Sequence, residues 1–183
     1  NELAVLSAHD GPVLSAAFSP NGKRVITTSA DKNARVWDVE KGAGLVTLQG
    51  HSDKIYSAAF SPDGLRVATV SKDHTVRIWN AATLDQLSIT LRGHKDALNA
   101  VAFSPSGGEI LTSSDDKTTK VWNTRDGQLI TELKGLSNLK PSFREKTLGE
   151  VNSAIFSPNG RFVVTSSSDR KVIVGEGQRS SHG

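Results

Sequence analysis

Apolar residues along this chain occur in short runs of five or six, in which apolar and small polar side chains tend to alternate. Residues that favour turns separate the runs at intervals of about 8–12 residues, as in proteins built from many short strands. No segment shows the 3.6-residue periodicity of an amphipathic helix. The pattern therefore predicts an all-β protein made of short antiparallel strands.

The tripeptide Phe-Ser-Pro divides these runs into four copies of one unit. It begins at Phe18, Phe60, Phe103 and Phe156, at intervals of 42, 43 and 53 residues. Each copy continues into a turn in which Pro presets φ and Gly supplies the positive φ of a tight reversal. One apolar run precedes this turn, two follow it, and a fourth leads to the next copy. Four antiparallel strands in about 40–45 residues is the period of a β-propeller blade.

Two dipeptides mark the limits of the unit. Gly-His, or Ala-His in the first copy, stands near its start, and Trp-Asp or Trp-Asn stands near its end in the first three copies. In these features the chain resembles the WD-repeat β-propeller family. The resemblance implies four blades of four antiparallel strands, which we call a to d in chain order. We expect repeats at about 1–44, 45–87, 88–133 and 134–174, an insertion loop at 136–146 and a flexible tail at 175–183.

Polar residues keep fixed offsets in the first three copies. A histidine lies ten residues before the turn serine, and an aspartate lies six residues before the tryptophan, with hydroxyl residues two and four positions before that aspartate. The repetition argues against a Ser-His-Asp triad or a shared metal, because a catalytic set is needed once and histidines on separate blades do not converge on one ion. The family resemblance implies instead a buried hydrogen-bond chain in each blade, from Trp through a hydroxyl and His to Asp. We assign this structural network to His9, Ser29, Asp31 and Trp37, to His51, Ser71, Asp73 and Trp79, and to His94, Ser114, Asp116 and Trp122.

The fourth copy departs from the pattern. Thr147 stands where His is expected, Gly175 stands where Trp is expected, and Glu176 follows it. Asp169 remains, so we expect the turn between strands b and c to survive without the network. The insertion before this copy is either a tolerated surface loop or a functional one, since long loops in compact domains are often functional.

The two ends of the chain complement each other. The segment before His9 has the pattern of an outer strand, and the last copy ends after its third strand. Three arrangements follow: a four-bladed ring closed by this segment, an eight-bladed ring in which two chains exchange it, or a piece of a longer ring. An open arc would leave an unpaired edge and apolar faces in contact with water. We favour a homodimer formed by strand exchange.

Composition narrows the functional classes. The chain has no cysteine, which excludes disulfides and thiolate metal sites, and it has no apolar run near the roughly 20 residues of a membrane span. Its net charge of +3 comes from scattered basic and acidic residues, and aromatic residues make up 5%. That balance of charge and the shortage of aromatic residues argue against nucleic-acid binding. We expect a cytoplasmic, non-enzymatic protein without cofactor or metal.

The resemblance implies an interaction scaffold, because WD-repeat propellers bind proteins or peptides where the b–c turns and d–a loops meet. The alternatives are the sensor part of a larger signalling protein and a nucleic-acid-binding propeller. An excess of basic residues in the turns would suit an acidic or phosphorylated peptide. The candidate partner-binding residues are Lys32, Lys54, Lys72, Lys95, Lys117 and Arg170.

Overall fold

The computed structural model describes residues 5–81, 83, 86–134 and 149–176. These residues form strands and connecting turns, and no helix among them could span a membrane. The strands are β1 (Val13–Phe18), β2 (Arg24–Ser29), β3 (Ala34–Asp38), β4 (Ala43–Leu48), β5 (Ile55–Phe60), β6 (Arg66–Ser71), β7 (Thr75–Asn80), β8 (Gln86–Arg92), β9 (Leu98–Phe103), β10 (Glu109–Ser114), β11 (Thr118–Asn123), β12 (Leu129–Lys134), β13 (Val151–Phe156), β14 (Phe162–Ser167) and β15 (Val172–Glu176).

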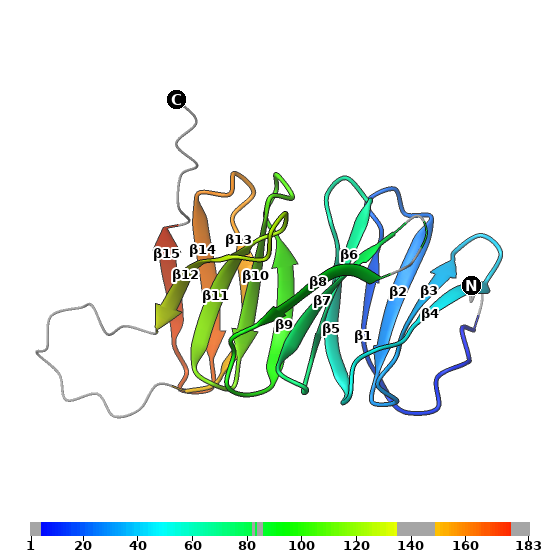
Figure 1. Ribbon diagram of the computed structural model, residues 1–183, viewed down its shortest axis with the longest axis horizontal. Coiled ribbons are helices and arrows are strands. Elements are labelled where there is room, and N and C mark those ends of the chain that lie inside the picture. The colour runs from blue at the N-terminus through cyan, green and yellow to red at the C-terminus, as the bar shows by residue number, and fades with distance from the viewer. Residues whose placement is uncertain (1–4, 82, 84–85, 135–148, 177–183) are drawn as a thin grey trace, which may run out of the picture.

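The strands form four separate antiparallel sheets, each with its strands in chain order (Figure 1). We call β1–β4 blade 1, β5–β8 blade 2, β9–β12 blade 3 and β13–β15 blade 4. The a–b hairpin is the same in all four, because Gly22, Gly64, Gly107 and Gly160 adopt φ between 69° and 71°. The all-β architecture and the propeller-type blades predicted from the sequence are confirmed.

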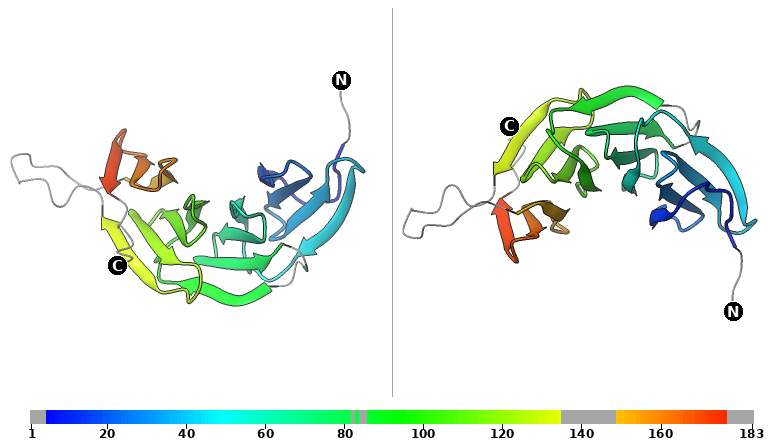
Figure 2. Two further views of the ribbon diagram at one scale, coloured as in Figure 1. Left: turned by 90° about the horizontal axis from the view of Figure 1, so that it is seen from above. Right: turned by 90° about the horizontal axis from the view of Figure 1, so that it is seen from below.

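The blades stand side by side along an open arc (Figure 2). Strands β1, β5, β9 and β13 lie on its inner side, and β4, β8 and β12 lie on its outer side. Blades 1 and 4 stand at opposite ends of the arc. The ring that a single chain would close with four blades is therefore not formed, which removes one of the three arrangements considered above.

The apolar core lies between blades and is assembled from repeated positions. A preceding blade contributes residues from its strands b, c and d, and the following blade contributes residues from its strands a and b and its tryptophan. Between blades 1 and 2 the buried contributors include Ile26, Val36, Leu48, Ile55, Val67 and Trp79. Between blades 2 and 3 they include Ala68, Ile78, Leu91, Leu98, Ile110 and Trp122. The third interface is smaller, because Gly175 occupies the tryptophan position of blade 4.

Blade 4 has three strands among the described residues, as expected for a last copy that ends after its third strand. Residues 5–8 form no strand with the other described residues of this chain. One expectation is corrected. Strand β15 extends through Gly175 and Glu176, which the sequence interpretation placed in the tail. The insertion loop at 136–146 and the tail beyond 176 lie outside the described residues.

Replacing Ile78 with alanine will test the inter-blade core. Ile78 is fully buried between blades 2 and 3, so Ile78→Ala should lower the free energy of unfolding by about 2–5 kcal/mol. Leu65→Ala is the control, because Leu65 is exposed in an a–b turn and its loss should change stability by no more than about 0.5 kcal/mol. Urea denaturation, followed by tryptophan fluorescence, measures the free energy of unfolding of each variant. Equal losses in Ile78→Ala and Leu65→Ala would contradict the burial of Ile78 between the blades.

Candidate functional site

A buried hydrogen-bond chain crosses blade 1. The indole Nε1–H of Trp37 donates to Thr27 Oγ1 at 2.8 Å, and Thr27 Oγ1 lies 2.8 Å from His9 Nε2. The other ring nitrogen, His9 Nδ1, lies 2.8 Å from Asp31 Oδ2. An indole can only donate and a carboxylate can only accept. With a neutral imidazole, the hydrogen bonds can therefore run in only one direction: the Thr27 hydroxyl donates to His9 Nε2, and His9 Nδ1–H donates to Asp31.

Blades 2 and 3 repeat this chain. In blade 3, Trp122 Nε1 donates to Thr112 Oγ1 at 2.9 Å, His94 Nε2 lies 2.8 Å from Thr112, and His94 Nδ1 lies 2.8 Å from Asp116. In blade 2 the same distances of 2.9, 2.8 and 2.8 Å join Trp79, Thr69, His51 and Asp73.

The hydroxyl in the chain is a threonine, so assigning Ser29, Ser71 and Ser114 to this position is wrong. Ser29 Oγ instead donates to the Gly11 carbonyl at 3.1 Å and accepts the Asp31 backbone N–H at 3.1 Å. The reason is position along strand b: the threonine lies within the strand beside the indole, and the serine lies at its end beside the d–a loop. Ser71 and Ser114 make the equivalent bonds to the carbonyls of Asp53 and Asp96. The serines therefore tie the b–c turn to the d–a loop.

The network aspartate also holds both loops through backbone amides. Asp31 Oδ2 accepts the Asp10 N–H at 3.0 Å, and Oδ1 accepts the Asn33 N–H at 2.9 Å. Burial raises the pKa of Asp31, but these bonds and the one from His9 outweigh burial and hold the pKa below its usual value. The carboxylate therefore stays ionised and anchors the turn.

Asp116 is held in the same way. Burial raises its pKa, but hydrogen bonds from Thr118 and from the Lys95 backbone amide outweigh burial and bring the pKa to about 2.

Each clamped b–c turn presents one non-glycine residue in the left-handed conformation. Backbone φ is 70° at Lys32, 65° at His74, 70° at Lys117 and 68° at Arg170. L-residues adopt this conformation at a cost of about 1–2 kcal/mol, which the surrounding bonds must offset. The four side chains therefore occupy equivalent places on the end of the arc that carries the b–c turns and d–a loops, which we call the loop face.

The structure divides the six candidate partner-binding residues into three groups. Lys32, Lys117 and Arg170 occupy the left-handed position, and Lys95 lies in a d–a loop, where its backbone N–H donates to Asp116. Lys72 does not belong to the first group, because His74 holds that position in blade 2. Instead, the Lys72 backbone N–H donates to the Lys54 carbonyl at 2.9 Å, so adjacent loops bring two exposed lysines together.

Acidic residues interrupt the basic ones on the loop face. His74 Nε2 lies 4.0 Å from Asp96 Oδ1, and Asn99 Nδ2 donates to Asp115 at 2.6 Å. Asp10, Asp53 and Glu150 lie in the same loops. The face thus has mixed charge, and Lys54 and Lys72 lie on two adjacent loops of it. Among the described residues, no group of three or more His, Asp or Glu could hold a metal ion.

Blade 4 keeps the turn without the indole. Asp169 accepts the Ser167 hydroxyl and the Lys171 backbone N–H, and Arg170 retains the left-handed conformation. Thr165 is buried as its counterparts are, but Gly175 offers no N–H from a side chain. The turn therefore depends on the aspartate rather than on the tryptophan, as the sequence predicted.

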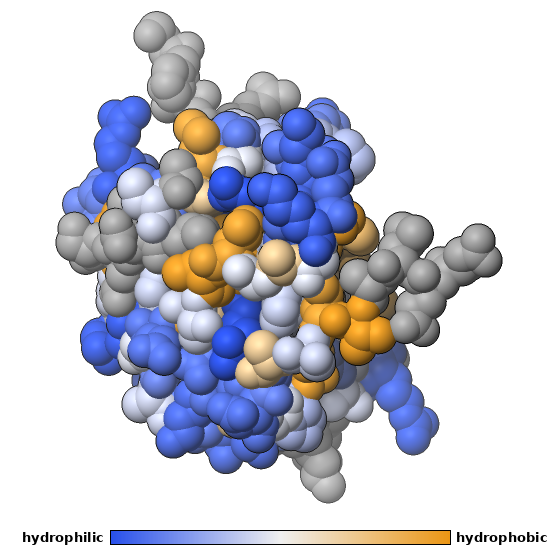
Figure 3. Space-filling view, turned by 90° about the vertical axis from the view of Figure 1, so that its right-hand side faces the viewer, coloured by the Kyte–Doolittle hydropathy of each residue, from blue (hydrophilic) through white to orange (hydrophobic). Residues whose placement is uncertain are grey.

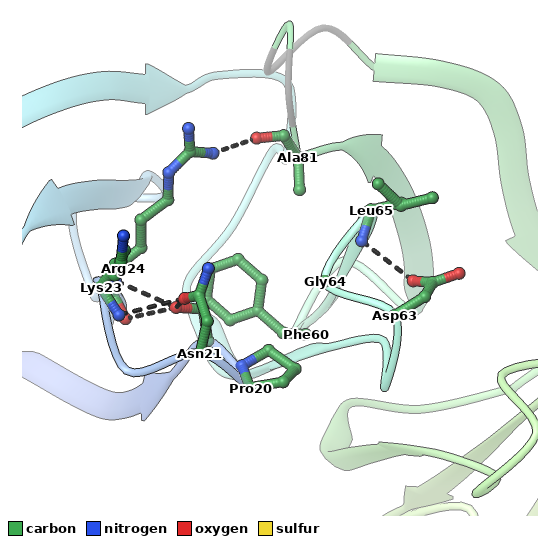
Figure 4. Close-up of a pocket in the computed structure, with 10 residues that line it drawn as sticks. Pro20, Asn21, Lys23, Arg24, Phe60, Asp63, Gly64, Leu65 and Ala81 are labelled. Atoms are coloured by element: carbon green, nitrogen blue, oxygen red, sulfur yellow. Dashed lines mark hydrogen bonds between the residues drawn. The ribbon is translucent and has the colours of Figure 1, made fainter.

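A cavity of about 380 Å³ lies at the opposite end of the strands, between the a–b turns of blades 1 and 2 (Figure 4). Phe60 and Leu65 line it together with Lys23 and Asp63. Arg24 and Ala81 also line the cavity, and the Arg24 guanidinium donates to the Ala81 carbonyl. The cavity lies away from the six candidate residues on the loop face.

Removing the relay hydroxyl of blade 3 will test the network. Thr112→Val keeps the side-chain shape but leaves the buried N–H of Trp122 and Nε2 of His94 without their partner. We expect a loss of about 2–4 kcal/mol in unfolding free energy. Thr165→Val is the matched control, because blade 4 has no indole, and its loss should stay below about 1 kcal/mol. Equal losses in urea denaturation would count against the relay.

The network also predicts acid sensitivity. Burial lowers the pKa of His94 below 6.5, although Asp116 opposes the shift. The unfolded state then binds more protons than the folded state as pH falls through 6.5, so stability must fall with pH in that range. Asp116, with its lowered pKa, adds a second loss between about pH 4 and pH 2. The free energy of unfolding, measured by urea denaturation from pH 7.5 to pH 5, should fall in the wild type and fall less in His94→Gln. A wild-type value that stays constant over this range would contradict the prediction.

Comparison with known proteins agrees with this geometry. The family model "WD domain, G-beta repeat" matches residues 1–38, 42–80, 85–123 and 138–174. A segment of 42 residues is 48% identical to transcription initiation factor TFIID subunit 5 of Arabidopsis thaliana, and covers 23% of this chain and 6% of that protein. A segment of 34 residues is 50% identical to the periodic tryptophan protein 2 homolog of Neurospora crassa, and covers 19% of this chain and 4% of that protein.

The matched segments thus span less than a tenth of the length of these relatives. The family model, in contrast, covers most of the chain, in four successive matches. WD40 repeats generally build non-enzymatic scaffolds for protein interactions. The four matches, together with the blades and the repeated Trp–Thr–His–Asp chain, show that this chain belongs to the WD40 repeat family.

Proposed function

We propose that this protein is a non-enzymatic scaffold that binds an acidic or phosphorylated peptide segment through its loop face. The observation that carries the proposal is the Lys54–Lys72 pair, which stands on two adjacent loops joined by a backbone hydrogen bond. Both side chains are exposed and their loops are clamped by Asp73 and Ser71. Loops held in this way lose little backbone entropy on binding, and the two ammonium groups can form charge-assisted hydrogen bonds with an anionic partner.

A non-enzymatic role is supported by the hydrogen bonds of the hydroxyl and imidazole groups, which would otherwise be candidates for nucleophile and base. In blades 1 to 3, each network threonine bonds a tryptophan and a histidine, and each histidine bonds an aspartate. These groups are buried or nearly so, and their hydrogen bonds hold the loops together. The same residues therefore serve the scaffold rather than a reaction centre.

We propose further that the scaffold works as a pair of chains and in the cytoplasm. Pairing is supported by the open arc and by blade 4, which has three strands among the described residues. A cytoplasmic location rests on the absence of cysteine, which fits a reducing compartment without requiring one.

A labelled oligoglutamate peptide is a suitable first probe of the basic pair. Fluorescence anisotropy at low ionic strength should show binding that weakens as salt is added. The double variant Lys54→Glu/Lys72→Glu should bind at least about tenfold more weakly, because two attractive charges become repulsive. Lys41→Glu is the matched control, since this exposed lysine lies in a c–d turn at the other end of the strands, and it should bind as the wild type does.

Two results would overturn the proposal. Equal loss in Lys41→Glu would show that binding follows net charge alone. Tighter and more steeply salt-dependent binding of single-stranded RNA than of the peptide would indicate a nucleic-acid-binding propeller instead.

A further inference from the structure

The cavity between the a–b turns of blades 1 and 2 has the size of a ligand site. At about 380 Å³ it falls within the range of about 300–1,000 Å³ that ligand pockets occupy. Its lining comes from both blades, with Pro20 and Arg24 on one side and Phe60, Leu65 and Ala81 on the other. Phe60 and Ala81 also belong to the buried core between the two blades. The cavity is therefore held in shape by elements that are packed against each other.

The blade 2 side of the cavity is apolar up to its rim. Phe60 is 9% exposed and Leu65 is 62% exposed. In Figure 4, Leu65 and Arg24 lie on opposite sides of the cavity, with Phe60 between them. A single exposed leucine is ordinary on a protein surface, but one beside an apolar cavity enlarges the surface that an apolar group can contact. The equivalent residues of the other three turns are Lys23, Gly108 and Arg161.

The next interface along the arc places an arginine over the equivalent ring. Arg66 donates to the Gly107 carbonyl at 2.8 Å, and its guanidinium carbon lies 5.7 Å from the centre of the Phe103 ring. Arg24 is the blade 1 equivalent of Arg66, but it donates to the carbonyl that follows strand β7. Phe60, the equivalent of Phe103, borders the cavity instead. The same repeat position therefore has different surroundings in the two interfaces.

The charges at the cavity favour an anionic group. Asp63 is the acidic residue of the lining, and it has partners: Oδ1 accepts the Leu65 backbone N–H at 2.9 Å, and Oδ2 lies 3.9 Å from Arg66 Nη2. Lys23 lines the cavity from blade 1, is exposed, and forms no ion pair with any residue that the structure describes. A negative charge brought beside Lys23 therefore finds an available cation.

We propose that this cavity binds a segment of a partner protein in which a large apolar residue stands next to an acidic one. The apolar side chain contacts Phe60 and Leu65, and the carboxylate pairs with the Lys23 ammonium. The exposed rim suits a peptide, whose chain must pass in and out of the site. A single anchor in a preformed pocket can carry much of the affinity of such a contact. Because the cavity lies at the opposite end of the strands from Lys54 and Lys72, the scaffold can hold two partners at once.

The blocked dipeptide acetyl-Leu-Glu-amide is a suitable probe, followed by NMR of the isotope-labelled protein, which detects weak binding. The backbone amides of Gly64, Leu65 and Ala81 should show saturable shifts. Acetyl-Ala-Glu-amide should bind at least about tenfold more weakly, because it buries fewer methyl and methylene groups. Acetyl-Leu-Gln-amide should bind about two- to fivefold more weakly, because it cannot pair with the ammonium.

Two variants with matched controls assign the contacts. Leu65→Asp should weaken binding of acetyl-Leu-Glu-amide at least about tenfold, because it replaces apolar surface with a repelling charge. Leu129→Asp should bind as the wild type does, since Leu129 is exposed on the outer strand β12 of blade 3. Lys23→Gln should abolish the preference for Glu over Gln in the peptide. Arg161→Gln, at the equivalent turn position of blade 4, should keep that preference.

The map of shifted amides also identifies binding elsewhere. Blade 1 has exposed apolar residues of its own, Val13 and Phe18 among them. Figure 3 views the molecule from the blade 1 side and shows apolar side chains gathered across the middle of that face. Shifts confined to this face would overturn the cavity site. Shifts around Lys54 and Lys72 that disappear in Lys54→Glu/Lys72→Glu would assign the peptide to the loop face and would also overturn it.

The remaining outcomes separate this site from the function proposed above. No saturable shift at the cavity, or equal binding of all three dipeptides, would overturn the cavity site. Neither result bears on the oligoglutamate test of the loop face. Cavity binding that persists in Lys54→Glu/Lys72→Glu would support two independent sites on one scaffold.

Discussion

The fold of each complete blade depends on one carboxylate. Asp31, Asp73 and Asp116 each accept a histidine N–H, the backbone N–H at the start of the d–a loop and the backbone N–H two residues further along the b–c turn. A side chain with one methylene places its two oxygens between the loops, where glutamate would overshoot. The remaining parts of the blade follow: the histidine orients the threonine, the threonine takes the indole, and the indole packs between blades.

The sequence predicted most of this arrangement because the repeat period places equivalent residues in register. Four copies of Phe-Ser-Pro and three tryptophans are enough to define the blades, the hairpins and the network histidines and aspartates. The sequence could not show whether Thr27 or Ser29 joins the tryptophan to the histidine, because both recur at fixed offsets and lie on the same side of strand b. Only the position of the indole along the strand decides that Thr27 receives it.

Other details have similarly local causes. Lys72 and His74 lie in the same b–c turn, but it is His74 that takes the left-handed position held by Lys32 in blade 1. The missing fourth strand of blade 4 was predicted correctly, and residues 5–8 form no strand with the other described residues of this chain. Pattern along a sequence can identify an outer strand, but it cannot specify which blade the strand joins, because that depends on the distance between the ends of the arc.

Closure and binding are separable because the clamp acts inside each blade. The turns that carry Lys32, Lys117 and Arg170 are fixed by their own aspartates, and the loops of Lys54 and Lys72 are joined within blade 2. A site confined to one or two neighbouring blades is therefore already formed in the open arc, and it does not require the ring. The same repeat thus supplies rigid local binding elements, one at each b–c turn that its own aspartate holds.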